Sequence, residues 1–560
     1  MRLRHFDPTL LVFLAIAAIL VLLVLNPLVR LVATSLTTGD GQSWTLDNYV
    51  SAYSRARYLQ ALLNSLILGG AVSVMCVVFA VPIAWGVART DMPFKGAIRV
   101  LVLGAFITPP YLGAIAWILL AGPNAGWINR MAMAVTGAAE GPFNIYSFPG
   151  LIFVVAIYSF PYLFIFTSTA LELVSSELED AANILGAGTL RTIFKVTLPL
   201  VLPAILGGVI ITFLEAIALF GSPALIAVPA RINVVTTQLW QFFGTPARPE
   251  VAAAYAMPLL VITVALFAWQ RRMTSRKGYV SQTGKGGERR ILVLGRWRWA
   301  LFVYAMVVLS LSVILPYAVL AQAAFTRAWG RGLSLGNLTF ANFHYILFEH
   351  QTARQSVVNS FTYAAASAFL AIFIALLIAF VVVRKLVPYA RVLSFLCMAP
   401  FVIPGIILAI GFYAAYASPP FSLYNTAWIL ILAFTTRFLP IAYANAEAAV
   451  RSVNPEMEEA VRILGGGRLT ALRRVTIPLL KSSMVGAWLL VFIPATRELS
   501  AAIFLYGPDT RTMSVMLFDM SEEGNFEYLA ALGFLLLAAS IVLVGLGYRL
   551  LGRDFMLRRG

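Results

Sequence analysis

Long apolar runs dominate this chain, and most of them exceed the length that a helix in a soluble core needs. A membrane-crossing helix requires about 20 consecutive apolar residues. Alternation of apolar and polar positions over ten residues, which is typical of a membrane β-barrel, is absent from the sequence. Runs of the required length lie at 10–29, 61–88, 100–121, 149–171, 196–230, 251–269, 299–326, 356–383, 392–436, 482–507 and 528–548.

The run at 392–436 has room for two helices, and we place the break between them at Ser418-Pro419-Pro420. The pattern therefore predicts an all-α polytopic membrane protein with about 12 transmembrane helices. Two of the runs contain ionisable residues: Glu215 lies in 196–230, while Arg497 and Glu498 lie in 482–507.

Composition agrees with this interpretation. Hydrophobic residues make up 60% of the 560 residues and charged residues only 12%, whereas soluble chains carry about 25% charged residues. The mean hydropathy is +0.86. The chain has two cysteines and three histidines, so neither a disulfide framework nor a Cys/His metal cluster is expected.

The net charge of +17 is explained by topology, because cytoplasmic loops of membrane proteins are rich in Lys and Arg. We expect no nucleic-acid partner. All the basic clusters fall on one side if both termini are cytoplasmic and twelve helices lie between them. These clusters include Arg2 and Arg4, Arg89, Lys95 and Arg99, the segment 271–298, Arg384, Lys385 and Arg391, and the C-terminal Arg549, Arg553, Arg558 and Arg559.

The sequence also contains an internal repeat. Its offset is 294 to 295 residues early in each half and 279 later, so the extra residues of the first half fall in the loop Gly122–Pro149. Each half has six predicted spans, which makes the halves parallel repeats. The matching positions are Thr45–Tyr49 with Thr339–Phe343, Asn64-Ser65 with Asn359-Ser360, Pro109 with Pro404, Pro161 with Pro440, Gly186 with Gly465, and Pro199 with Pro478.

We therefore divide the chain into a first repeat at 1–270, a basic cytoplasmic linker at 271–298 and a second repeat at 299–560. The linker contains the Gly-rich stretch Ser281–Gly287, which is typical of a flexible segment.

One polar segment in each half, at 175–199 and 453–478, follows the fourth predicted span and lies in the cytoplasm. Acidic residues crowd the start of each segment, where a helix dipole favours them, and Asn454-Pro455 is typical of a helix start. Gly186 and Gly465 are placed to end a short helix, and a second basic amphipathic stretch follows each of them. The pattern predicts two cytoplasmic helix–Gly–helix units.

These units resemble the coupling-loop signature of ABC importer permeases, and the chain resembles their fused double-permease type. The first copy consists of Glu179, Asp180, Ala181, Ala182, Gly186 and Pro199, and the second of Glu458, Glu459, Ala460, Val461, Gly465 and Pro478. Asp180 stands where the family usually has Glu, and Val461 stands where it usually has Ala.

The resemblance implies the fold of type I ABC importer transmembrane domains in a multi-pass inner-membrane protein. It also implies that the two loops contact two copies of a cytosolic ABC ATPase subunit, and that a periplasmic or extracellular solute-binding protein delivers the solute. The substrate would be ferric iron first, with thiamine, phosphonate and polyamine as alternatives. The segment Arg497–Ala502 is similar to a motif of the ferric-iron group.

The chain has no phosphate-binding loop of its own. Thr283-Gly284-Lys285-Gly286 lacks the required spacing and hydroxyl residue, and Gly465-Gly466-Gly467 lacks a following Lys-Ser/Thr. We therefore expect a transport subunit rather than an enzyme. It would bind no cofactor itself, and its partner subunits would carry ATP and Mg²⁺.

Four residues are candidates for the translocation path. Glu215 and Glu498 are carboxylates within apolar runs, where ionisable groups usually serve function. Pro109 and Pro404 interrupt the third and ninth spans, and broken helices are tolerated only against protein or a cavity. Structural alternatives are that the two carboxylates cap or pair with neighbouring helices, or that Glu498 lies near a helix break. The prolines can also be packing kinks, and Arg437 can pair with Glu447.

A function of another class stays open at this point. A secondary transporter of the major facilitator type also has twelve spans in parallel halves. It has no reason to display two matched cytoplasmic helix–Gly–helix units, and it usually needs membrane carboxylates for ion coupling.

Overall fold

The computed structural model describes residues 8–174, 176–276, 291–332, 334–387 and 389–551. Within them, ten helices are long and apolar enough to cross a membrane, and the number rises to twelve when each of two bent helix pairs is counted as one span. These pairs bend by 99° and 112°, at Pro109 and Pro404 respectively. The predicted number of spans is therefore confirmed, with the third and ninth spans broken.

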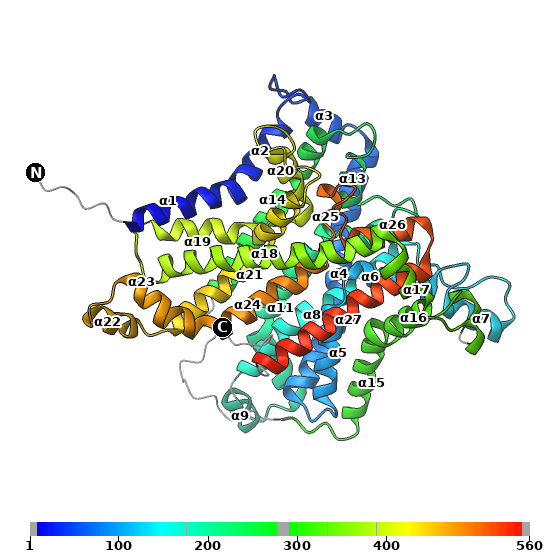
Figure 1. The fold of residues 1–560 in the computed structure, drawn as a ribbon. Helices are drawn as coiled ribbons and strands as arrows, with labels where there is room; N and C mark the ends of the chain where they lie inside the picture. Colours follow the sequence, from blue (N-terminus) through cyan, green and yellow to red (C-terminus); the bar gives the residue numbers. More distant parts are fainter. Residues whose placement is uncertain (1–7, 175, 277–290, 333, 388, 552–560) are drawn as a thin grey trace, which may run out of the picture.

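The described residues of the first half form fourteen α-helices, most of which are labelled in Figure 1. They are α1 (Pro8–Leu20), α2 (Asn26–Ser35), α3 (Asp47–Tyr53), α4 (Ala56–Arg89), α5 (Lys95–Ile107), α6 (Pro110–Ala121), α7 (Trp127–Thr136), α8 (Phe148–Leu173), α9 (Ser176–Ile184), α10 (Thr189–Thr192), α11 (Leu198–Ala218), α12 (Gly221–Ile226), α13 (Val235–Gln241) and α14 (Pro249–Arg276).

The second half repeats this order without a counterpart of α7. Because α7 lies inside Gly122–Pro149, the predicted place of the insertion is confirmed. The helices are α15 (Trp297–Leu309), α16 (Leu315–Ala324), α17 (Ala341–His344), α18 (Gln351–Val383), α19 (Ala390–Met398), α20 (Gly405–Tyr416), α21 (Ala427–Ser452), α22 (Pro455–Ile463), α23 (Arg468–Ala471), α24 (Ile477–Thr496), α25 (Ala502–Leu505), α26 (Met513–Glu523) and α27 (Phe526–Leu551).

Wide π-helical turns recur at equivalent places in the two halves. They join α1 to α2 and α15 to α16, and they lead into α11 and α24. A proline follows each of these turns at the second position of the next helix. Proline lacks an N–H and clashes with the carbonyl four residues earlier, so a locally widened turn lets these helices continue.

The first span of each half packs against the opposite half. Helix α2 contacts α20, and α16 contacts α6. Figure 1 shows the blue α1 running beside α19 of the second half. The two halves are thus interlocked, and the second segment of each broken span is covered by a helix from the other repeat.

Two of the repeated sequence motifs fix loops and helix starts. Asn48 donates to the carbonyls of Ser35 and Thr37, and Asn342 donates to those of Ala324 and Thr326. The hydroxyls of Ser65 and Ser360 accept the backbone N–H groups of Val235 and Met513, the first residues of α13 and α26, at 2.8 and 2.7 Å. These residues recur because each half needs the same bonds.

Two predicted spans are shorter than their apolar runs. The runs 196–230 and 482–507 stop being continuous helix after Ala218 and Thr496, and their remaining residues form the short buried helices α12 and α25. Hydropathy cannot mark these ends, because the residues beyond them are buried in protein rather than exposed to water.

The end of the linker is attached to the first half. Leu292 pairs with Thr90, and the backbone N–H of Leu294 donates to the Asp91 carboxylate at 2.8 Å. That hydrogen bond, aided by Arg298 at 3.4 Å, lowers the pKa of Asp91 below its ordinary value. The Gly-rich stretch that we predicted to be flexible lies outside the described residues.

Candidate functional site

A cavity of about 170 Å³ lies where the two halves meet. Elements from both repeats line it: the breaks of the third and ninth spans, the end of α11 and the segment that follows α24. Three of the four predicted path residues, Pro109, Glu215 and Glu498, line the cavity. The fourth, Pro404, precedes Gly405, which lines it as well.

Two arginines from the second half stabilise the breaks in the third and ninth spans. A helix end leaves carbonyl groups without intrahelical partners, and at membrane depth these need another donor. Arg437 donates from Nη1 to the carbonyl of Ile403 at 2.6 Å. Arg497 donates from Nη1 to the carbonyl of Ile107. Both arginines also line the cavity.

The alternative pairing of Arg437 with Glu447 is wrong. Glu447 forms an ion pair with Arg451, one helical turn further along α21, at 2.6 Å. The broken span provides a nearer acceptor for Arg437 than a carboxylate ten residues away on the same helix. The break itself therefore determines where this arginine points.

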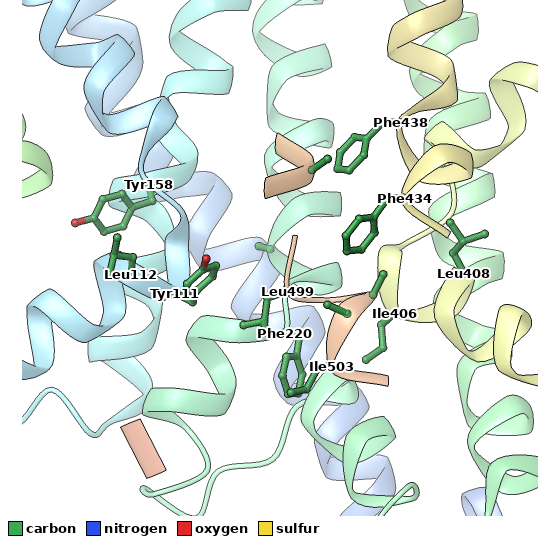
Figure 2. Close-up of a cluster of buried hydrophobic side chains, with 14 of the residues drawn as sticks. Tyr111, Leu112, Tyr158, Phe220, Ile406, Leu408, Phe434, Phe438, Leu499 and Ile503 are labelled. Atoms are coloured by element: carbon green, nitrogen blue, oxygen red, sulfur yellow. The ribbon is translucent and has the colours of Figure 1, made fainter. Parts of the chain in front are cut away.

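Oxygen-bearing side chains complete the cavity wall. Glu498 accepts the backbone N–H of Ala501, the residue before α25, at 3.0 Å through one oxygen, and it also lines the cavity. Tyr111 and Tyr158 are 4% and 2% exposed, and their hydroxyls have no hydrogen-bond partner within the described chain. Both lie in the cluster shown in Figure 2 and line the cavity together with Tyr162.

Gly405 lies close to two charged side chains of the cavity wall. A Cβ there would lie 3.3 Å from the Glu498 carboxylate oxygen and 3.5 Å from Nε of Arg437. The ninth span therefore passes between an acid and a base of the cavity wall. A side chain at this position would take up space next to both.

A cluster of aromatic side chains lies between residues of this cavity and residues of a second one of about 620 Å³. The ring centroid of Phe220 lies 5.8 Å from that of Phe518 and 6.2 Å from that of Phe504. Trp240 and Phe504 line the second cavity, whereas Leu499 lines the first; Phe220, Leu499 and Ile503 appear in Figure 2.

The two polar segments at 175–199 and 453–478 form the predicted helix–Gly–helix units. Helices α9 and α22 are each followed by a glycine with positive φ, +82° at Gly186 and +84° at Gly465, a conformation that favours glycine. Asn454 accepts the backbone N–H of Glu456 at 3.1 Å and so caps α22 as predicted. The two units lie apart in Figure 1, α22 in orange and α9 in teal.

The residues of the predicted coupling set divide into two groups. Glu179 is 4% exposed, and the Glu458 side chain is 15% exposed; both turn toward the membrane domain. The rest lie at least partly on the surface of the units: Asp180, Ala181, Ala182, Gly186, Pro199, Glu459, Ala460, Val461, Gly465 and Pro478.

The partners of Glu179 and Glu458 were not predicted. Glu179 forms an ion pair with Arg89, and its Oε1 accepts from Thr197 at 2.7 Å. Glu458 pairs with Arg384 at 2.7 Å, and its Oε1 accepts from Thr476 at 3.0 Å. Sequence reasoning assigned Arg89 and Arg384 to topology alone. The sequence did contain a signal for them, because Arg89 and Arg384 occupy equivalent positions of the repeat, after the second span of each half.

Exposed apolar side chains at the tips of the units also escaped prediction. Ile184 and Leu185 are each 86% exposed, and Ile463 and Leu464 are 85% and 87% exposed. Each pair directly precedes the glycine of its unit. Large apolar side chains so exposed, at the same place in both repeats, are typical of an interaction surface.

No group of three or more His, Cys, Asp or Glu side chains suited to hold a metal ion occurs among the residues that the structure describes.

The chain is similar to known transport proteins. The ferric transport system permease protein FbpB of Actinobacillus pleuropneumoniae is 24% identical over 520 residues, which cover 90% of this chain and 73% of that protein. A Salmonella paratyphi A protein named as the 2-aminoethylphosphonate transport system permease PhnV is 26% identical over 247 residues, 44% of this chain and 92% of that protein.

A solved bacterial ABC transporter that imports the acidic polysaccharide alginate aligns with a TM-score of 0.37 at 18% identity, covering 42% of this chain and 86% of that chain. Residues 63–279 and 371–555 each match the family described as binding-protein-dependent transport system inner membrane component. The chain therefore belongs to this family of ABC importer permeases and carries its domain twice.

Proposed function

We propose that this permease moves ferric iron through the cavity between its two halves, driven by two copies of a cytosolic ABC ATPase. A binding protein outside the membrane would deliver the iron. The observation that carries the proposal is the cavity wall, on which Glu215, Glu498 and Tyr162 place oxygen donors. Hard cations such as Fe³⁺ prefer oxygen ligands.

The similarity to FbpB proteins supports this substrate. A second ferric permease, from Haemophilus influenzae, is 25% identical over 85% of this chain. Family membership removes the major facilitator alternative, because the chain carries two importer permease domains.

The ATPase contact is proposed at α9 and α22. Each unit exposes an apolar pair at its tip, Ile184-Leu185 in one and Ile463-Leu464 in the other. An acidic residue, Asp180 or Glu459, lies one turn before each pair. Two equivalent surfaces on one chain suit two copies of the same partner. Hydrolysis is assigned to that partner, because the sequence has no phosphate-binding loop.

A phosphonate is the second candidate substrate. Arg437 and Arg497 line the same cavity, and arginine is well suited to bind phosphate-like oxyanions. The similarity to PhnV, which matches 44% of this chain, fits this chemistry.

The test is uptake in proteoliposomes that contain the chain, its ATPase and its binding protein. We expect ATP-dependent uptake of radiolabelled ferric iron, lowered at least about ten-fold by Glu215→Gln, a loss that corresponds to ~1.4 kcal/mol. Arg451→Gln, at an exposed ion pair away from the cavity, is the control. Uptake of 2-aminoethylphosphonate without ferric iron would contradict the iron assignment and leave the importer mechanism in place.

A further inference from the structure

The same three-residue cluster occurs at the cytoplasmic end of each half. The first Arg–Glu–Thr cluster consists of Arg89, Glu179 and Thr197, and the second of Arg384, Glu458 and Thr476. In each, the arginine also donates to the backbone carbonyl just before the short helix, Val174 at 3.2 Å or Val453 at 3.0 Å. The two clusters thus agree in every partner, including a backbone group.

Each cluster joins three elements that are separate in the sequence. The arginine lies at the end of α4 or immediately after α18. The glutamate lies on the short helix, α9 or α22, and the threonine is the last residue before α11 or α24. The second span, the short helix and the fifth span of each half are therefore tied at one point.

A buried ion pair is a poor choice for stability alone. The Arg89 and Glu179 side chains are 1% and 5% exposed, and those of Arg384 and Glu458 are 11% and 15% exposed. Removing two charges from water offsets most of their mutual attraction, and such pairs are best attested where they fix a geometry. Here the fixed geometry is the angle of the short helix to two spans.

The spans that begin at these clusters end at the cavity. Helix α11 runs without a break from Leu198 to Ala218 and carries Glu215 near its far end. Helix α24 runs from Ile477 to Thr496, and Arg497 and Glu498 follow it directly. Helices of 21 and 20 residues are about 30 Å long, so each connects a cytoplasmic cluster to the cavity wall.

We infer that the two Arg–Glu–Thr clusters are positioning devices that make each short helix move as one body with α11 or α24. A displacement of α9 or α22 by the ATPase then reaches Glu215, Arg497 and Glu498 rather than being absorbed in the loop. The inference rests on the proposed docking of the ATPase at α9 and α22. It assigns Glu179 and Glu458 an internal role instead of a contact with the partner.

The test measures how accessible the cavity is to a thiol reagent, so it does not depend on the identity of the substrate. Ser500 lines the cavity, whereas Cys76 and Cys397 are both buried. In a Ser500→Cys chain with its ATPase, we expect ATP with vanadate to change the rate of labelling by a thiol reagent at least about five-fold. Introducing Glu458→Gln or Thr476→Val should reduce that change to less than about two-fold while the ATPase still co-purifies.

The controls separate positioning from folding and from docking. Arg451→Gln removes an exposed ion pair on the same side of the membrane and should keep the full nucleotide response. Thr476→Val keeps both charges and the side-chain shape, so it tests the link even where Glu458→Gln lowers the amount of folded protein. Combining the two changes should be no worse than either alone, because both break one cluster.

Two results would overturn the inference. If the nucleotide response persists in both Glu458→Gln and Thr476→Val, the clusters do not have the inferred role, while the proposed docking of the ATPase still stands. The second result concerns docking. If the Ser500→Cys chain still binds the ATPase and keeps its nucleotide response when Ile463 and Leu464 are replaced by serine, the ATPase docks elsewhere, and the inference is wrong together with the proposed docking.

Discussion

The two halves agree at the ends that carry α9 and α22 and differ where they meet. Both ends have the same helix–Gly–helix unit, the same exposed apolar pair and the same Arg–Glu–Thr cluster. At the cavity, Arg437 occupies the position that Tyr158 holds in the first half, and Glu215 corresponds to Pro494. Two identical partners require two identical surfaces, whereas one solute in one cavity does not require symmetry.

The comparison therefore separates residues that serve the partner from residues that serve the solute. A change at a symmetric position should have the same effect in either half. A change at an asymmetric position should have an effect in one half only.

The largest expected effect comes from reversing the charge on the short helices. Asp180→Lys and Glu459→Lys should each lower uptake at least about 100-fold, because a misplaced charge at a docking surface costs several kcal/mol. Uptake in proteoliposomes and co-purification of the ATPase measure the effect. The amount of chain in the membrane should stay unchanged.

The two variants control for each other, because Asp180→Lys and Glu459→Lys should lower uptake by the same factor. If only one of the two variants lost uptake, the halves would not be equivalent toward the ATPase. The interpretation of α9 and α22 as equivalent docking surfaces would then be wrong.

An intermediate and one-sided effect is expected at the cavity. Arg437→Met leaves the Ile403 carbonyl without its donor, and an unpaired buried acceptor costs about 1–3 kcal/mol. Uptake should fall roughly 5- to 160-fold. Tyr158→Phe at the matching position removes a hydroxyl that has no hydrogen-bond partner within the described chain, so it should change uptake less than about three-fold.

Arg437→Lys keeps a donor and should recover part of the lost uptake. Equal losses in Arg437→Met and Tyr158→Phe would contradict the asymmetry of the cavity.

The sequence predicts the symmetric parts of this molecule better than the asymmetric ones. Repeated motifs can be aligned with each other, so Gly186 and Gly465, Asn454 and the insertion at Gly122–Pro149 could be located from the chain alone. The prolines of the broken spans could also be found, because Pro109 and Pro404 disrupt helices locally.

The contacts around those breaks could not be predicted. Arg437 and Arg497 bind carbonyls of residues 34 and 390 positions away, and no local pattern marks such distances. Glu179 illustrates the same limit. Its charge suits a helix start, yet its partner Arg89 lies at the end of α4, 90 residues earlier in the sequence. Pairing across the fold depends on packing, which hydropathy does not describe.

The smallest effect should come from the serines that hold α13 and α26. Ser65→Ala and Ser360→Ala each remove the acceptor of one buried backbone N–H, which costs about 1 kcal/mol. The two variants should lower the thermal midpoint in detergent by similar amounts, about 2 °C each, and leave ATPase binding unchanged. Because Ser65 and Ser360 sit at equivalent places in the fold, a clearly larger shift in one of them would show that the halves contribute unequally to stability, although their bonds are the same.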